Sequence, residues 1–140
     1  MKTQVCVSFD YTNDKQYYYM LKAWDANSNF DFSFGDCTPS EIQSESVSRI
    51  KAVLTQKIDS ASYLLVIVGE EANKTHPDSR EIGYTNWQNY EIAKAKELGK
   101  RLVAVKISRD YDSPSELLNA NASWAMSFTE DAIVKALKGE

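Results

Sequence analysis

The chain has 140 residues and a net charge of −4, with 43% hydrophobic and 26% charged residues. A globular domain of this size buries roughly 68–70% of the surface that its unfolded chain exposes, so the composition excludes intrinsic disorder and predicts one domain over residues 1–140. Its lysines and arginines are scattered among the acids and form no basic stripe of the kind that binds nucleic-acid phosphates.

Few side chains could hold a metal or anchor the chain in a membrane. Cys6 and Cys37 form no CxxC pair and His76 is the only histidine, so we expect no metal site. We interpret Cys6 as a buried strand residue and His76 as a solvated loop residue. Because no run approaches about 18 apolar residues, neither a signal peptide nor a membrane span is expected, and the protein is predicted to be cytoplasmic.

Strand-like and helix-like segments alternate along the chain, which is typical of a mostly parallel α/β sheet covered on both faces. The first strand is predicted at 4–9, where QVCVSF is short, apolar and β-branched. A helix follows at 14–27 and contains a run of three tyrosines, of which Tyr18 and Tyr19 are expected at the surface or in an interface. The predicted core-facing stripe of this helix consists of Tyr17, Met20, Leu21 and Trp24.

The middle of the chain contains the most apolar run. FDFSF at 30–34 alternates like a strand with one face in water, which favours the edge of a sheet. After a polar loop at 35–46, apolar residues recur at helical spacing over 46–61. YLLVIVG at 63–69 is then predicted to be the central strand.

A long polar connection at 70–85 comes next and is expected to be either mobile or functional. It leads into a helix predicted at 86–100 and a buried strand at 101–107. A short last strand is predicted at 123–128, and a closing helix at 129–138 begins after a capping threonine. The predicted strands therefore number five.

The helix at 86–100 carries a carboxylate on its apolar side. At about 100° per residue, Glu91 falls in the same arc as Trp87 and Leu98. One interpretation is a residue at the edge of the buried face that pairs with Lys94. The other is a functional carboxylate, because ligands of open α/β sheets bind outside the carboxyl ends of the strands, where this helix begins.

Three stretches together resemble one family: VCVSFDYTNDKQYYYMLKAWDANSNFDFSF, VSRIKAVLTQKIDSASYLLVIVGEEANKT and IGYTNWQNYEIAKAKELGKRLVAVKI. The last is the most specific, because it contains the W-x-x-x-E pattern formed by Trp87 and Glu91. The chain resembles TIR-like domains, in particular the ThsB group of Thoeris antiphage defence. The resemblance implies a three-layer, flavodoxin-like α/β fold with a five-stranded, mostly parallel sheet of order 2-1-3-4-5.

The resemblance also implies a reaction and a site. Glu91 would be the catalytic residue that cleaves NAD⁺, as substrate, between nicotinamide and ribose, with no cofactor and no metal. Many TIR domains carry a cysteine after the tryptophan of this pattern, where this chain has Gln88. The residues implied to line the nucleotide pocket are Phe9, Asp10, Tyr11, Phe34, Asp36, Asn86 and Trp87.

One carboxylate suits this chemistry. Breaking the bond develops positive charge on the sugar, as in glycoside hydrolysis, and nicotinamide leaves as a neutral molecule from a cationic ring. Attack by water gives linear ADP-ribose, whereas attack by a group of the same nucleotide gives a cyclic product, and proximity decides between them. We therefore predict an NAD⁺ nucleosidase or ADP-ribosyl cyclase whose nucleotide signal, expected to be cyclic, activates a separate effector during phage infection. Toxic depletion of NAD⁺ also fits.

Other classes share this topology. A receiver domain needs a phosphorylatable aspartate after the third strand, where YLLVIVGEE ends in glycine and glutamates. A flavodoxin needs a phosphate-binding loop after the first strand, but SFDYTNDK contains no glycine. A TIR-like interaction module without turnover, which self-associates or binds a partner through tyrosines and helix faces, stays open.

Overall fold

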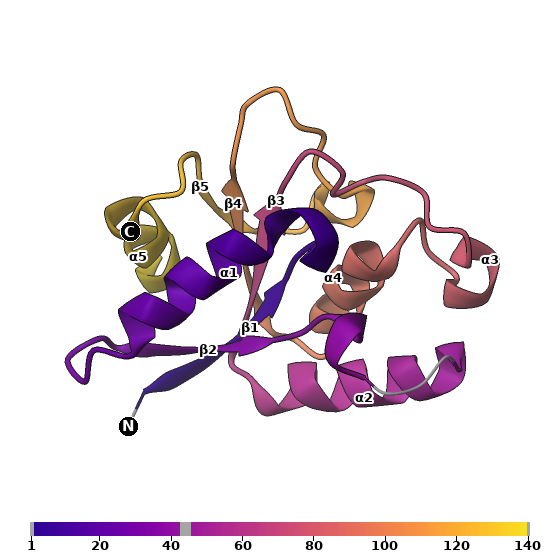
Figure 1. Ribbon diagram of the computed structural model, residues 1–140, viewed down its shortest axis with the longest axis horizontal. Helices are drawn as coiled ribbons and strands as arrows, with labels where there is room; N and C mark the ends of the chain where they lie inside the picture. The colour runs from indigo at the N-terminus through magenta and orange to yellow at the C-terminus, as the bar shows by residue number, and fades with distance from the viewer. Residues whose placement is uncertain (1, 43–45, 140) are drawn as a thin grey trace.

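The computed structural model describes residues 2–42 and 46–139, so residues 43–45 of the predicted polar loop lie outside the described part. Its sheet has five parallel strands in the order β2-β1-β3-β4-β5 and confirms the predicted fold (Figure 1). The central strand is β3, as expected, and β2 lies at an edge. The strands are β1 (Thr3–Ser8), β2 (Phe32–Asp36), β3 (Tyr63–Val68), β4 (Arg101–Lys106) and β5 (Ser123–Ala125).

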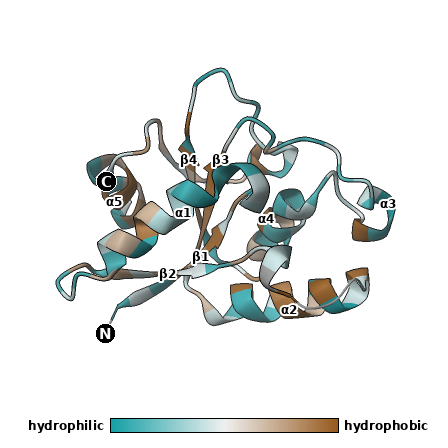
Figure 2. Cartoon of the chain, in the orientation of Figure 1, coloured by the Kyte–Doolittle hydropathy of each residue, from teal (hydrophilic) through white to brown (hydrophobic). Residues whose placement is uncertain are grey.

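Helices cover both faces of the sheet and enclose two cores. One core lies between the sheet and the pair α1 and α5, and the other between the sheet and the pair α2 and α4. Figure 2 shows hydrophobic residues along the inner strands β3 and β4 and also on α2 and α5, and the side chains of β3 and β4 are buried on both faces of the sheet. The helices are α1 (Tyr11–Asp25), α2 (Val47–Ser60), α3 (Ser79–Ile82), α4 (Trp87–Glu97) and α5 (Glu130–Lys138).

Strand β1 supplies side chains to both cores. Val5 and Val7 pack in the core under α1 and α5, whereas Cys6 packs in the core under α2 and α4. Because side chains alternate along a strand, Ser8 faces the same way as Cys6. The last residue of β1 is therefore directed towards α4.

The buried stripe of α1 differs from the prediction. The helix begins at Tyr11, after Asp10 caps it, and its buried side chains are Asp14, Tyr18 and Leu21. Met20 is 45% exposed, so its prediction as a core residue is wrong, and so is the prediction of a surface position for Tyr18. The hydrophobic pattern is misleading because an aspartate occupies one of the inward positions.

Other elements shift by a few residues. Helix α4 ends at Glu97, short of the predicted residue 100, and Gly99 follows with φ of 71°. Leu98 is therefore the C-cap of the helix and is 36% exposed, so it does not continue the apolar side on which Trp87 and Glu91 lie. Strand β5 ends at Ala125, short of the predicted 123–128. The connection 70–85 contains α3, and Pro39–Glu41 form a 3-10 turn. Within the described residues, no helix is both long and apolar enough to span a membrane.

Candidate functional site

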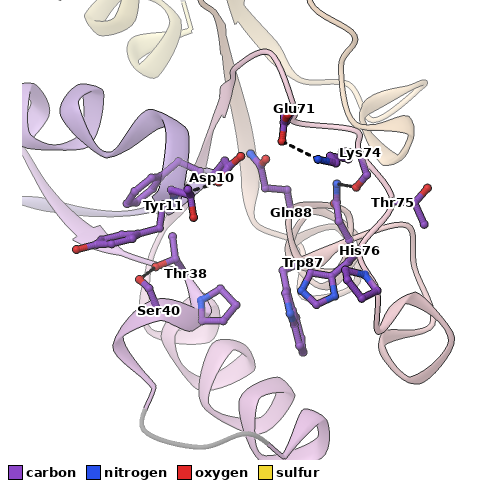
Figure 3. Close-up of a pocket in the computed structure, with 15 residues that line it drawn as sticks. Asp10, Tyr11, Thr38, Ser40, Glu71, Lys74, Thr75, His76, Trp87 and Gln88 are labelled. Carbon is purple, nitrogen blue, oxygen red and sulfur yellow. Dashed lines mark hydrogen bonds and ion pairs between the residues drawn. The ribbon is translucent and has the colours of Figure 1, made fainter.

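A cavity of about 390 Å³ opens beyond the carboxyl ends of β1 and β3 (Figure 3). Residues 9–12 after β1, the 38–40 turn, residues 74–77 and the start of α4 at 86–88 line it, together with Glu71. This is the edge at which open α/β sheets bind ligands. The long polar connection after β3, expected to be mobile or functional, thus forms one wall of the cavity.

The structure brings together most, but not all, of the residues predicted to line a pocket. Phe9, Asp10, Tyr11, Asn86 and Trp87 line the cavity, whereas Phe34 and Asp36 do not.

Phe34 and Asp36 have other places in the fold. Phe34 is 1% exposed and lies in the core under α1 and α5, because it points to that face of β2. Asp36 accepts a hydrogen bond from the Thr38 backbone at 2.7 Å. Asp36 therefore stabilises the 38–40 turn that lines the cavity, without lining the cavity itself.

Asn86 ties the start of α4 to the connection after β3. Its Oδ1 accepts from the Asn89 backbone N–H at 2.9 Å and so caps the helix. Its Nδ2 donates to the backbone carbonyls of Ala72 and Lys74, each at 2.9 Å. The side chain thus fixes two walls of the cavity relative to each other.

Trp87 and His76 form an aromatic corner of the cavity. Their ring centroids are 6.5 Å apart with an interplanar angle of 75°, and Trp87 also meets Tyr90 edge-on. His76 lies partly exposed in the connection after β3, where its Nδ1 accepts a hydrogen bond from the Asp78 backbone at 2.9 Å and its ring meets Trp87 on one side. Such a corner offers a flat apolar surface to a planar ring.

Gln88 was not predicted as a site residue, yet its side chain lines the cavity (Figure 3) and is 6% exposed. Its Nε2 donates to the backbone carbonyls of Ser8, at 3.3 Å, and Ile67, at 3.0 Å. The side chain therefore bridges the carboxyl ends of β1 and β3. In the sequence, the only indication of a role for this position was that Gln88 stands where many TIR domains have a cysteine.

Glu91 lies one turn beyond Trp87 and is 1% exposed, which confirms its position on the buried side of α4. Ser8 Oγ donates to its Oε1 at 2.5 Å, while its Oε2 has no hydrogen-bond partner among the described residues. The alternative pairing with Lys94 is wrong, because Lys94 bonds Glu97 at 3.0 Å. Glu91 does not itself line the cavity.

Burial raises the pKa of Glu91 well above its usual range, although the Ser8 hydrogen bond opposes this effect. Cys6 and Asp36 raise the pKa further, and Lys57 lowers it. This arrangement therefore favours the neutral acid form. A positive charge brought close to the carboxyl group would favour its ionised form instead.

The described residues contain no cluster of three or more histidine, cysteine, aspartate or glutamate side chains that could hold a metal ion. Cys6 and Cys37 are both free and buried. What the arrangement offers is an aromatic corner, polar groups at the cavity wall and a buried carboxyl group behind them. These features suit an organic ligand with a planar, cationic ring.

A family model described as Thoeris protein ThsB, TIR-like domain, matches residues 6–112. A search of curated proteins finds no significant match. A solved 2-deoxyribosyltransferase from Bacillus psychrosaccharolyticus is similar in fold, with a TM-score of 0.61, 10% identity and coverage of 93% of this chain and 90% of that chain. A second from Leishmania mexicana has a TM-score of 0.56, 10% identity and 94% coverage of both chains.

Proposed function

The chain belongs to the TIR-like domain family of the Thoeris protein ThsB, and from this membership we propose that it is an enzyme that cleaves NAD⁺ between nicotinamide and ribose. The family links the chain to Thoeris antiphage defence. The product in this proposal is an ADP-ribose-derived nucleotide, cyclic in form, that activates a separate effector.

The observation that carries this proposal is the unpaired Oε2 of Glu91. Buried polar atoms in proteins almost always have a hydrogen-bond partner, and one that lacks it calls for an explanation. Here Oε1 is held by Ser8 while Oε2 stays unpaired, one helical turn from the cavity wall at Trp87. A ribose hydroxyl of the substrate would satisfy this oxygen.

Glu91 must turn towards the cavity to act. One turn of helix spans about 5.4 Å, which lies within the reach of a glutamate side chain that rotates away from Ser8. Contacts of this kind are often absent from a ligand-free structure and form only with the substrate.

The charge of the substrate explains how a buried acid could become a useful carboxylate. Burial favours the neutral form of Glu91, whereas the pyridinium ring of NAD⁺ brings a positive charge that favours the ionised form. The carboxylate then stabilises the positive charge that develops on the ribose as the bond breaks. No second acid is needed, because nicotinamide leaves as a neutral molecule.

Mass spectrometry of NAD⁺ incubated with the protein, alone and in lysates of phage-infected cells, tests this proposal. We expect release of nicotinamide and a product derived from ADP-ribose, and a loss of roughly 100-fold or more in Glu91→Gln. Glu97→Gln is the matched control, because Glu97 is exposed on the same helix. A deoxynucleoside completes the substrate panel, since the solved structures of similar fold are named as deoxyribosyltransferases.

A second candidate is a TIR-like interaction module without turnover. It is favoured by the exposed Tyr19 and Met20 on α1, which are 53% and 45% exposed. Full antiphage protection by a Glu91→Gln strain would support this module and contradict the enzyme. Loss of protection together with loss of nicotinamide release would contradict the module.

A further inference from the structure

The orientation of the Gln88 amide is determined by its partners. Both groups that its Nε2 contacts are backbone carbonyls, which only accept hydrogen bonds. The NH₂ group must therefore face Ser8 and Ile67, and the opposite assignment of the amide is excluded. Consequently Oε1 occupies a fixed place as an acceptor.

This oxygen has no partner within the part of the chain that the structure describes. Oε1 of Gln88 is not among the fully buried atoms without a partner, unlike Oε2 of Glu91, and the Gln88 side chain lines the cavity. Figure 3 shows Gln88 on the wall between Asp10 and Lys74. Gln88 is thus a nearly buried side chain that presents one open acceptor to a ligand.

Ser8 fixes Gln88 relative to Glu91. Its carbonyl accepts from Gln88, and its hydroxyl donates to Glu91 at 2.5 Å. One residue at the end of β1 therefore holds both side chains of α4. A ligand group bound to Gln88 would therefore lie at the same end of β1 as Glu91, within the part of the site that this carboxyl group enters when it turns towards the cavity.

Resting on the function proposed above, we propose that Oε1 of Gln88 accepts a hydrogen bond from the carboxamide NH₂ of the nicotinamide ring. Gln88 is then a specificity residue, because it selects dinucleotides that carry an amide on the pyridine ring. A site built to accept from a donor discriminates against an analogue that lacks the donor, since its acceptor is left unpaired.

The charges of the neighbouring side chains favour this end of the substrate. Asp10 and Glu71 also line the cavity, and Asn13 bridges their carboxylates. Although Lys74 pairs with Glu71 at 3.3 Å, two carboxylates near Gln88 attract a cationic ring and repel a ring-bound carboxylate.

Calorimetric titration of the Glu91→Gln protein, in which we expect almost no substrate turnover, tests the assignment with three dinucleotides. The pyridinium ring carries a carboxamide in NAD⁺, a neutral acetyl group without an N–H in the 3-acetylpyridine analogue, and a carboxylate in the nicotinic acid analogue. We expect binding of the acetyl analogue to be roughly five- to tenfold weaker than that of NAD⁺, and binding of the acid analogue to be weaker still. Equal affinity for NAD⁺ and the acetyl analogue would overturn the assignment.

A second variant separates the effect of the Gln88 hydrogen bond from the effect of the negative charges that line the cavity. Adding Gln88→Met should bring the affinities for NAD⁺ and the acetyl analogue to within about twofold. Glu71→Gln, the control, should leave that ratio unchanged and weaken only the rejection of the acid. If Gln88→Met does not fold, as judged by its melting curve, the comparison of the three ligands on the parent protein decides.

The same titrations distinguish the two proposals. If NAD⁺ does not bind at millimolar concentration, the proposed function fails and the assignment of Gln88 fails with it. If NAD⁺ binds and the ratio is unity, only the role of Gln88 is overturned.

Discussion

Asp14 provides the sharpest test of how this fold handles buried charge. Its side chain is 6% exposed in the first turn of α1, and its Oδ2 has no hydrogen-bond partner among the described residues. Burial, and then the negative charges of Asp10, Glu70 and Glu71, raise its pKa from 3.8 to about 6. We predict that Asp14→Asn stabilises the protein at neutral pH.

The magnitude follows from proton linkage. One pKa unit corresponds to about 1.36 kcal/mol, so a change from 3.8 to about 6 corresponds to about 3 kcal/mol. The unfolded chain loses the proton of Asp14 near pH 4 and the folded chain near pH 6. Between these values the folded state holds more protons, so the wild-type free energy of unfolding falls as the pH rises and stays low above pH 6.

Urea unfolding of wild type and Asp14→Asn at pH 4 and pH 7 measures this difference. The stability of the variant relative to wild type should rise by about 2 kcal/mol between the two pH values, because the remainder of the change lies below pH 4. For a domain of this size that is roughly 5–10 °C in melting temperature. Asp112→Asn, at an exposed position, is the control and should change nothing. A relative stability that is the same at both pH values would refute the reasoning.

Three further predictions concern the same edge of the sheet. Gly69→Ala should lower the free energy of unfolding by roughly 1–3 kcal/mol, because the new Cβ would lie 2.0 Å from Asp14 Oδ2. Adding Asp14→Ala to this variant should restore most of the lost stability. Gly35→Ala is the control and should be neutral in the same urea assay, because no atom lies within 4 Å of its new Cβ. Glu91→Gln should gain stability relative to wild type as the pH rises above about 4.5. Burial raises the pKa of Glu91, so the wild type loses stability once the unfolded chain releases this proton while the folded chain still holds it. Thermal melts of the two proteins that stay parallel as the pH rises would contradict this prediction. Ser8→Ala removes the hydrogen bond that lowers the pKa of Glu91, so the pH profile of NAD⁺ cleavage should move to higher pH, and an unchanged profile would argue against this pair.

The sequence was sufficient to predict the sheet because apolar runs and helical spacing carry most of that information. YLLVIVG is continuous and β-branched, and it forms the central strand β3. The error in α1 has a local cause. Asp14 occupies an inward position next to Gly69, where a side chain would not fit, and no rule based on hydropathy assigns an aspartate to a core.

The site was only partly predictable for a similar reason. The position of Glu91 on the buried side of α4 follows from its spacing relative to Trp87. The contact between Glu91 and Ser8 depends on how α4 packs across β1, and the spacing of residues along one helix carries no information about that packing. The strand alternation in FDFSF does contain the information that Phe34 faces the same core as Phe32, away from the α4 face of the sheet.

The first turns of α4 contain buried polar side chains that lower the stability of the fold. Gln88, Asn89 and Glu91 are all buried there, where apolar side chains would normally stabilise a helix on its sheet. Gln88 and Asn89 recover part of this cost through hydrogen bonds to β1, to β3 and to the Glu116 backbone. Glu91 does so only on one oxygen. Since a well-packed apolar residue would be more stable at this position, the buried acid is best explained by its reaction, and a Glu91→Leu protein that is more stable at pH 7 yet releases no nicotinamide would be the expected result.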